Sequence, residues 1–204
     1  MTEIRLVGAR ALLVECADAA QVEAWRAELG RRRQAGELAA VDIVPGARTV
    51  LLDGLPDPVA AARAIAGWPP PPPAGAADGP LVEIPTVYDG ADLPAVAAHW
   101  GLRPVVAAAR LAAAELRVAF CGFAPGFAYL TGLPGPDIPR LATPRPRVPA
   151  GSVALAGPYA GIYPTASPGG WRLVGRTTVT LFEPDREPPA LLAPGTRVRL
   201  VAAP

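Results

Sequence analysis

Five arginines lie in one stretch of the chain that is also rich in aromatic side chains, glycine and proline. They are Arg140, Arg145, Arg147, Arg172 and Arg176, and seven of the twelve aromatic residues lie in the same stretch, Phe120–Thr177. All 19 basic residues are arginine, which excludes a Schiff-base lysine or the lysine of a phosphate-binding loop in this chain. Recognition of a phosphate or a carboxylate would therefore depend on arginine forks or on backbone amides.

The turns of Phe120–Thr177 are specified one by one, because glycine permits backbone angles that other residues avoid and proline fixes φ. The run CGFAPGFAYL places Phe123, Phe127 and Tyr129 around a Pro-Gly turn. This pattern is typical of an aromatic hairpin closing one side of a barrel, or of the wall of a ligand pocket. The strand-like run SVALA and a Gly-Gly turn before Trp171 follow.

Composition sets limits on the class of protein. The chain has 204 residues, of which 51% are hydrophobic and 18% charged, so it is far from the composition of disordered proteins. A net charge of +1 gives no electrostatic reason to expect nucleic acid or an anionic membrane surface as a partner. His99 is the only histidine, which argues against a histidine-rich metal site, and no metal ligands are predicted.

The cysteines and the N-terminus bear on the cellular compartment. Cys16 and Cys121 lie in different halves of the chain; a disulfide between them is possible, but two free thiols are the expectation. No apolar run reaches the roughly 18 residues of a membrane span, and the N-terminus does not have the pattern of a signal peptide. We expect a cytoplasmic protein.

The first 68 residues predict a small domain of helices and strands. Short β-favouring runs at 4–7 and 11–15 precede a helical pattern that Asp18 would cap. Two further strand-like runs are joined by Pro45-Gly46, and a second helical pattern follows. This order of elements predicts an α/β sandwich of ferredoxin-like type over residues 1–68.

A proline-rich segment, residues 69–80, is predicted to be a linker, because five consecutive prolines form a stiff extended segment. The alternative is a proline motif that binds another protein. Residues 81–204 then form a second domain, beginning with a strand and two short helices, the first capped by Asp92. A DNA-reading helix-turn-helix is disfavoured there by the low charge.

Four blocks of the second half carry a family resemblance: GFAPGFAYL, TPRPRVPAGSVALAG, IYPTASPGGW and LVGRT. In their order and spacing the chain resembles the KipI/allophanate hydrolase subunit 1 family, and weaker similarity extends through the N-terminal half. The resemblance implies an α+β fold, in which a small N-terminal ferredoxin-like α/β domain is followed by a cyclophilin-like β-barrel domain. The chain departs from the family at Leu111 and Leu116, where histidine and tyrosine are common.

The resemblance also implies a function, since the family includes the B subunit of bacterial 5-oxoprolinase, an enzyme that opens 5-oxoproline to glutamate with ATP. The implied partners are the C subunit (allophanate hydrolase subunit 2, KipA-like) and the A subunit. Two alternatives stay open: a KipI-type regulator that inhibits a sensor histidine kinase by binding it, and a component of an allophanate-hydrolase-like amidohydrolase. ATP, with Mg²⁺, is expected in the complex, and no cofactor is predicted for the isolated chain.

Lactam opening needs groups that bind anions and orient a small carboxylate. The substrate- or anion-binding candidates are Arg145, Arg147, Ser152, Tyr163, Ser167, Gly169, Gly170 and Arg176, and the predicted pocket wall is Phe123, Phe127, Tyr129 and Trp171. An arginine on a proline-rich loop can equally pair with a nearby acid and hold the loop. No catalytic residue is predicted, so we expect a composite site to which a partner protein also contributes.

Overall fold

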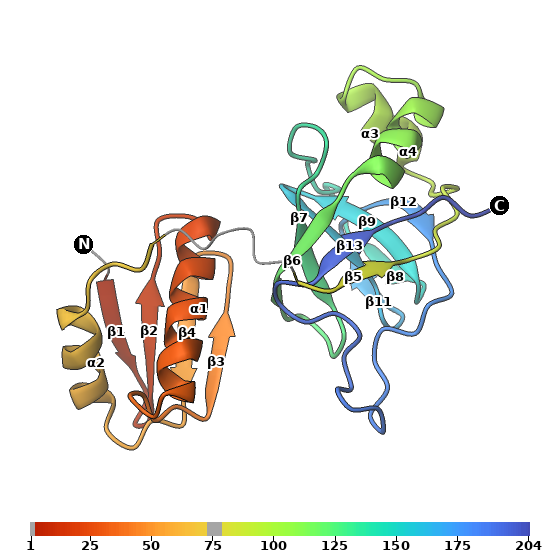
Figure 1. Cartoon of the computed structure of the whole chain (residues 1–204). Coiled ribbons are helices and arrows are strands. Elements are labelled where there is room, and N and C mark those ends of the chain that lie inside the picture. Colours follow the sequence, from red (N-terminus) through yellow and green to blue (C-terminus); the bar gives the residue numbers. More distant parts are fainter. Residues whose placement is uncertain (1–2, 73–78) are drawn as a thin grey trace. The chain divides into compact units, whose positions relative to one another are not determined.

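A computed structural model describes residues 3–72 and 79–204 of the chain, which divides into two units, Met1–Ala77 and Asp78–Pro204 (Figure 1). The division falls inside the predicted linker 69–80, of which residues 73–78 lie outside the described residues. The predicted domain limits at 68 and 81 remain predictions.

The first unit is a four-stranded antiparallel sheet with two helices. Its strands lie in the order β1-β2-β4-β3. The elements are β1 (Glu3–Val7), β2 (Ala11–Glu15), α1 (Ala19–Gln34), β3 (Asp42–Pro45), β4 (Thr49–Asp53) and α2 (Pro58–Gly67). The predicted cap of α1 is confirmed, because the Asp18 carboxylate accepts a 2.8 Å hydrogen bond from the Gln21 amide.

One hydrophobic core explains why both helices pack on the same face of this sheet. Leu12 lies opposite Leu52 in the register of β2 and β4, and both side chains are fully buried. Trp25 of α1 and Ile65 of α2 belong to the same buried cluster. A ferredoxin-like unit has its fourth strand after the second helix, whereas here β1 precedes β2. The ferredoxin-like assignment remains a prediction.

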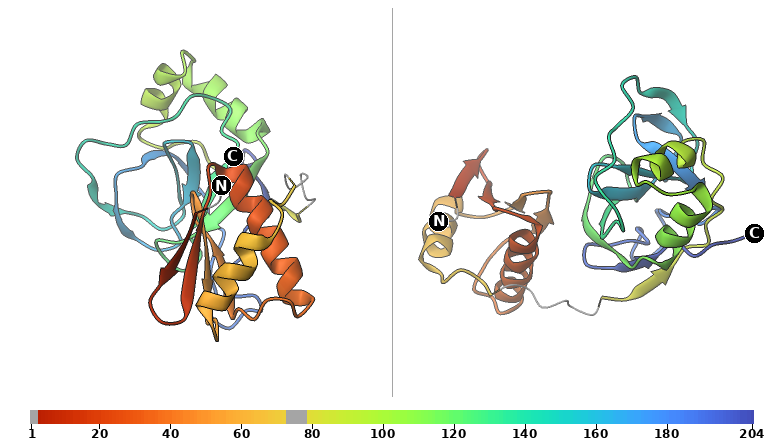
Figure 2. Two further views of the ribbon diagram at one scale, coloured as in Figure 1. Left: turned by 90° about the vertical axis from the view of Figure 1, so that its left-hand side faces the viewer. Right: turned by 90° about the horizontal axis from the view of Figure 1, so that it is seen from above.

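The second unit contains a seven-stranded sheet in the order β12-β9-β10-β7-β6-β13-β5 and a two-stranded sheet, β11-β8. Helices α3 and α4 lie together at one end of it (Figures 1 and 2). The elements are β5 (Leu81–Glu83), α3 (Leu93–His99), α4 (Pro104–Ala113), β6 (Leu116–Cys121), β7 (Ala128–Thr131), β8 (Arg145–Val148), β9 (Ser152–Ala156), β10 (Tyr159–Ile162), β11 (Ser167–Gly169), β12 (Arg172–Arg176) and β13 (Arg197–Arg199).

The seven-stranded sheet curls until its two ends meet. Val87, which follows β5 at one end, exchanges two backbone hydrogen bonds of 2.9 Å with Arg176 of β12 at the other. The predicted mixture of helices and strands around a curved sheet is therefore confirmed as a curled half-barrel. Its finer description as a cyclophilin-like barrel remains a prediction.

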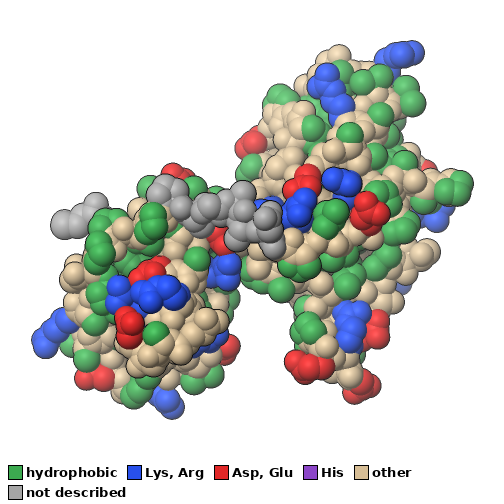
Figure 3. All heavy atoms as spheres, in the orientation of Figure 1, with side chains coloured by type: hydrophobic (Ala, Val, Ile, Leu, Met, Phe, Trp, Pro, Cys, Tyr) green, Lys and Arg blue, Asp and Glu red, His purple; other side chains and the backbone are tan. Residues whose placement is uncertain are grey.

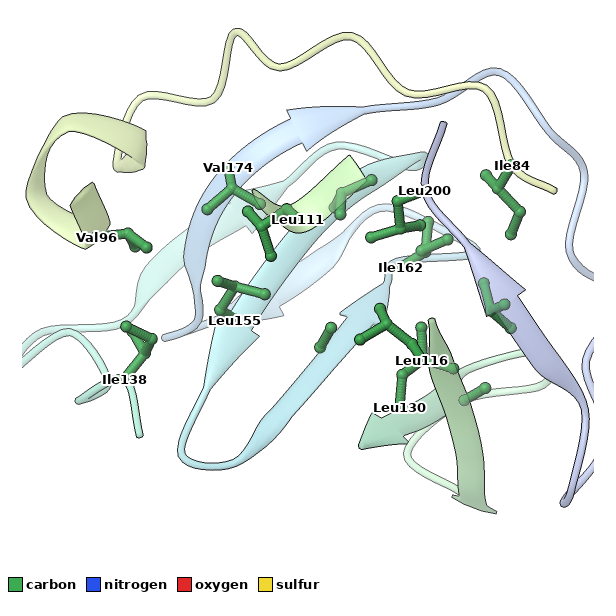
Figure 4. Close-up of a cluster of buried hydrophobic side chains, with 14 of the residues drawn as sticks. Ile84, Val96, Leu111, Leu116, Leu130, Ile138, Leu155, Ile162, Val174 and Leu200 are labelled. Carbon is green, nitrogen blue, oxygen red and sulfur yellow. The ribbon is translucent and has the colours of Figure 1, made fainter. Parts of the chain in front are cut away.

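The inner side of the curl is filled by aliphatic side chains (Figure 4). Val153 and Leu155 of β9 point into this cluster, because every second residue of a strand faces the same side. Leu111 of α4 and Leu116 of β6 belong to it and are fully buried. At these two positions, where the family commonly has polar side chains, the present chain uses leucine to fill its core.

The long connection from β12 to β13 projects from the second unit and carries charge at its tip. Glu183, Asp185 and Glu187 are exposed there, and Arg186 pairs with Glu183 at 3.3 Å. Figure 3 shows acidic and basic side chains together at the lower end of this unit. These carboxylates lie at the surface, as the sequence predicts. None of the helices in the described ranges is long and apolar enough to cross a membrane.

Candidate functional site

A pocket of about 260 Å³ opens on the second unit, on the side of the sheet opposite the aliphatic core. We call it the aromatic pocket. Its lining consists of aromatic rings, two prolines, two glycines and one arginine: Phe123, Phe127, Tyr129, Arg140, Pro144, Tyr163, Pro168, Gly169, Gly170 and Trp171. The lining holds no acidic side chain.

Small residues in the central strands make room for the rings. On β9, Ala154 and Ala156 face the aromatic cluster, while their neighbours face the aliphatic core. Gly161 of β10 lies so close to Phe127 and Trp171 that a Cβ there would meet both rings within about 3 Å. The ring centroids of Phe127 and Trp171 lie 5.5 Å apart, nearly perpendicular, which is a favourable edge-to-face arrangement.

Phe123 stands at the mouth of the pocket in an unusual backbone conformation. The Ala124 amide donates to the Gly122 carbonyl at 2.9 Å, so Phe123 is the central residue of a three-residue turn, with φ of 71°. It is the only non-glycine residue with positive φ in the described ranges. Its side chain is 62% exposed yet packs edge-on against Phe127 at 5.2 Å. A strained, exposed aromatic residue beside a pocket is a candidate for ligand contact.

Tyr163 supplies the buried polar group of the pocket. Burial raises the pKa of its phenol, and a hydrogen bond from the Trp171 backbone and the positive charges of Arg140 and Arg145 oppose that shift without reversing it. The phenol is therefore neutral and able to donate a hydrogen bond at physiological pH. Gly169 lies against its hydroxyl so closely that any Cβ at this position would overlap it.

The structure brings together most of the residues predicted from sequence. The four predicted wall residues, Phe123, Phe127, Tyr129 and Trp171, all line the pocket, and so do Tyr163, Gly169 and Gly170 from the binding candidates. Whether they bind substrate remains a proposal.

Arg145 lies next to the pocket, but its guanidinium is held by an acid from outside the motif-rich stretch. Its Nη2 lies 2.9 Å from the buried carboxylate of Asp92, and its Nη1 donates to the Trp171 carbonyl at 3.4 Å. Asp92 also accepts from the Leu173 amide at 2.7 Å. The prediction that the Asp92 side chain caps α3 is therefore wrong: the carboxylate makes no capping hydrogen bond and instead ties β8 to β12.

The remaining candidates lie outside the pocket lining. Arg176 forms an exposed ion pair of 2.8 Å with Asp89, and Arg147 is an exposed residue of β8. Ser152 is buried at the start of β9, where its carbonyl accepts from the Tyr163 amide at 3.0 Å. The hydroxyl of Ser167, just before Pro168, is buried without a hydrogen-bond partner in the described part of the chain.

Sequence reasoning missed Arg140 as a pocket residue and Asp92 as the partner of Arg145. The position of Arg140 before the TPRPRVP block gave a weak signal, since it shares a proline-rich loop with the candidates that were chosen. For metals, residues 3–72 and 79–204 contain no group of three or more His, Cys, Asp or Glu side chains suited to hold an ion.

Comparison with known proteins identifies relatives for almost the whole chain. Residues 2–192 match the family model described as "Carboxyltransferase domain, subdomain C and D". In solved structures, TTHA0988 superimposes with a TM-score of 0.76 at 34% identity, over 99% of this chain and 40% of that protein.

Curated relatives match about three fifths of the chain, and all of those compared here are named as the B subunit of 5-oxoprolinase. The one from Escherichia coli O157:H7 is 50% identical over 125 residues, and the one from Bacillus subtilis (strain 168) is 43% identical over 125 residues. Each alignment covers 59% of this chain, and 57% and 52% of the respective relative. The chain thus spans little more than half of these relatives, whose names confirm the predicted resemblance.

Proposed function

The chain belongs to the family of carboxyltransferase domains, subdomains C and D, and we propose that it acts as the B subunit of an ATP-dependent 5-oxoprolinase complex. One observation carries the proposal: curated relatives at 42–50% identity bear the name of that 5-oxoprolinase component. In the proposed reaction, water opens the lactam ring of 5-oxoproline and glutamate is released. The C and A subunits are the proposed partners.

Within that complex, we assign substrate binding to the aromatic pocket. The substrate is a single five-membered ring with one carboxylate, and a pocket of about 260 Å³ is smaller than the roughly 300–1,000 Å³ typical of drug-sized ligands. Stacked and edge-on rings suit the faces of a small ring, and the neutral Tyr163 phenol suits an oxygen acceptor. Holding the ring in one orientation is how this chain would assist the reaction.

ATP would supply phosphoryl activation of the lactam oxygen when it is bound in the complex. The residues of this chain do not fit a magnesium–nucleotide site: it has no lysine, the pocket lining has no carboxylate, and the described residues form no cluster of metal ligands. We therefore assign the nucleotide to the other two proteins of the complex and expect the isolated chain to be inactive. The names of the curated relatives favour neither a kinase inhibitor nor a component of allophanate hydrolase.

The test is to co-express the chain with the C and A subunits encoded in the same genome, and to measure glutamate released from 5-oxoproline with and without ATP. We expect turnover that needs all three proteins and ATP. Preparations that lack any one of the three serve as controls. A stable, well-folded complex without turnover would overturn the proposal.

A further inference from the structure

Arg140 is the one arginine of the pocket lining, and its surroundings hold its backbone while leaving its side chain available. The carbonyl of Pro139, before it, accepts from Arg172 Nε at 3.2 Å. The amide of Leu141, after it, donates to the Gly170 carbonyl at 2.8 Å. These two contacts fix the loop against the Gly169–Gly170 turn, which itself lines the pocket.

The guanidinium of Arg140, in contrast, forms no hydrogen bond or ion pair with any residue in the described ranges 3–72 and 79–204. The neighbouring cations are engaged: Arg145 by Asp92 and Arg172 by the Pro139 carbonyl. Arg140 is thus an exposed cation at a pocket that has no acidic side chain in its lining. Its charge also acts on the Tyr163 phenol, so the two polar groups lie near each other.

We propose that Arg140 binds the carboxylate of the pocket's ligand, so that the aromatic pocket selects a small ring bearing one carboxylate. The planar fork of a guanidinium matches a carboxylate and forms paired, charge-assisted hydrogen bonds with it. The rings of Phe127, Tyr163 and Trp171 then contact the ring of the ligand. The inference rests on the proposed function where it names 5-oxoproline as that ligand.

This arrangement explains why the pocket combines an apolar wall with one available cation. An apolar wall alone would accept any small ring, and it could not discriminate strongly against a ring that lacks the carboxylate. A dedicated cation changes this, because an anion gains charge-assisted hydrogen bonds that the neutral ring cannot make. The fixed backbone on both sides of Arg140 lowers the cost of ordering the loop when the ligand binds.

The test compares ligands and variants by isothermal titration calorimetry on the full chain and on the complex with the C and A subunits. The ligands are 5-oxoproline and 2-pyrrolidinone, which is the same lactam ring without the carboxylate. The variants are Arg140→Gln, which removes the charge, and Arg140→Lys, which keeps the charge but not the fork. Arg110→Gln is the matched control, since Arg110 is exposed on α4 and its side chain also has no partner among the described residues.

We expect 5-oxoproline to bind far more tightly than 2-pyrrolidinone. Arg140→Gln should weaken 5-oxoproline binding roughly 10- to 100-fold, as expected for hydrogen bonds to a charged group, and should leave 2-pyrrolidinone binding unchanged. Arg140→Lys should recover part of the loss, and Arg110→Gln should match the parent chain. Equal affinity for the two rings, or 5-oxoproline binding that survives Arg140→Gln in both preparations, would overturn the inference, as would the absence of binding to both.

Turnover separates this inference from the proposed function. If the complex opens 5-oxoproline and Arg140→Gln leaves its KM unchanged, the inference fails and the function stands. If the complex shows no turnover but the chain binds 5-oxoproline through Arg140, the function fails and the carboxylate site stands.

Discussion

The curled sheet of the second unit presents two faces that are built from alternate residues of the same strands. On β9, Val153 and Leu155 face the aliphatic core, and Ala154 and Ala156 face the aromatic rings. On β7, Leu130 faces the aliphatic core and Tyr129 faces the aromatic side. A difference of one residue therefore decides which of two environments a side chain enters.

The two faces differ in what they leave open. The aliphatic face is covered by α3 and α4, and its central residues are fully buried. The aromatic face combines small strand residues with large rings from turns, and it retains a pocket with an available cation. Close packing of aliphatic side chains stabilises the sheet, whereas rings held by turns shape a site. Substitutions on the two faces should therefore separate stability from ligand binding.

The largest effect on stability is expected on the aliphatic face. Leu111→Ala removes a fully buried side chain that α4 packs against the core, which should lower the free energy of unfolding by about 2–5 kcal/mol. Urea denaturation followed by circular dichroism measures this change. The affinity of the remaining folded protein for 5-oxoproline should equal that of the parent chain. A destabilised variant with a weakened site would show that the faces are coupled.

The largest effect on binding is expected from Gly169→Ala on the aromatic face. The new Cβ would overlap the Tyr163 hydroxyl, so the ring or β11 must move. Overpacking of this kind costs about 1–3 kcal/mol, and loss of a similar free energy from ligand binding is roughly tenfold or more in affinity. Calorimetric titration with 5-oxoproline measures it. Gly30→Ala is the control, because nothing lies within 4 Å of a Cβ there; equal affinities for both variants would contradict the expectation.

Much of the fold was predictable because its signals are local. Asp18 caps α1, Pro45-Gly46 begins the turn between β3 and β4, and the run SVALA is β9. The strand β8 was missed, since Pro146 within it reads as part of a loop, and proline is tolerated there only because the two-stranded sheet has open edges. Closure of the curl by Val87 and Arg176 depends on residues far apart in sequence, and no local pattern announces it.

The site divides in the same way. Rings clustered around glycine and proline predicted the pocket wall, because aromatic residues on specified turns have few other places to go. Arginine roles could not be read locally, since each depends on which acid lies beside it in space. Asp92, far from the motif blocks, engages Arg145 and leaves Arg140 as the available cation.

A smaller effect should follow from Phe123→Gly, which tests whether the ring at the pocket mouth contacts ligand. Glycine adopts positive φ without strain, so the free energy of unfolding should stay the same or rise by up to about 1 kcal/mol. Loss of one aromatic contact should weaken 5-oxoproline binding roughly three- to tenfold. Denaturation and titration on the same sample measure both. Reduced stability together with unchanged affinity would assign the ring to folding alone.

The smallest effect is expected at Arg176, which sequence reasoning ranked among the anion-binding candidates. Its ion pair with Asp89 is solvent-exposed, with side-chain exposures of 60% and 47%, and such pairs contribute about 0–1 kcal/mol. Arg176→Ala should therefore change the unfolding free energy by less than about 1 kcal/mol and 5-oxoproline affinity by less than about twofold. The backbone of this residue closes the curl through its hydrogen bonds to Val87, and alanine preserves both of them. A tenfold loss of affinity would instead place an anion site on the edge of the sheet, away from the aromatic pocket, and would remove the contrast between the two faces on which the other predictions depend.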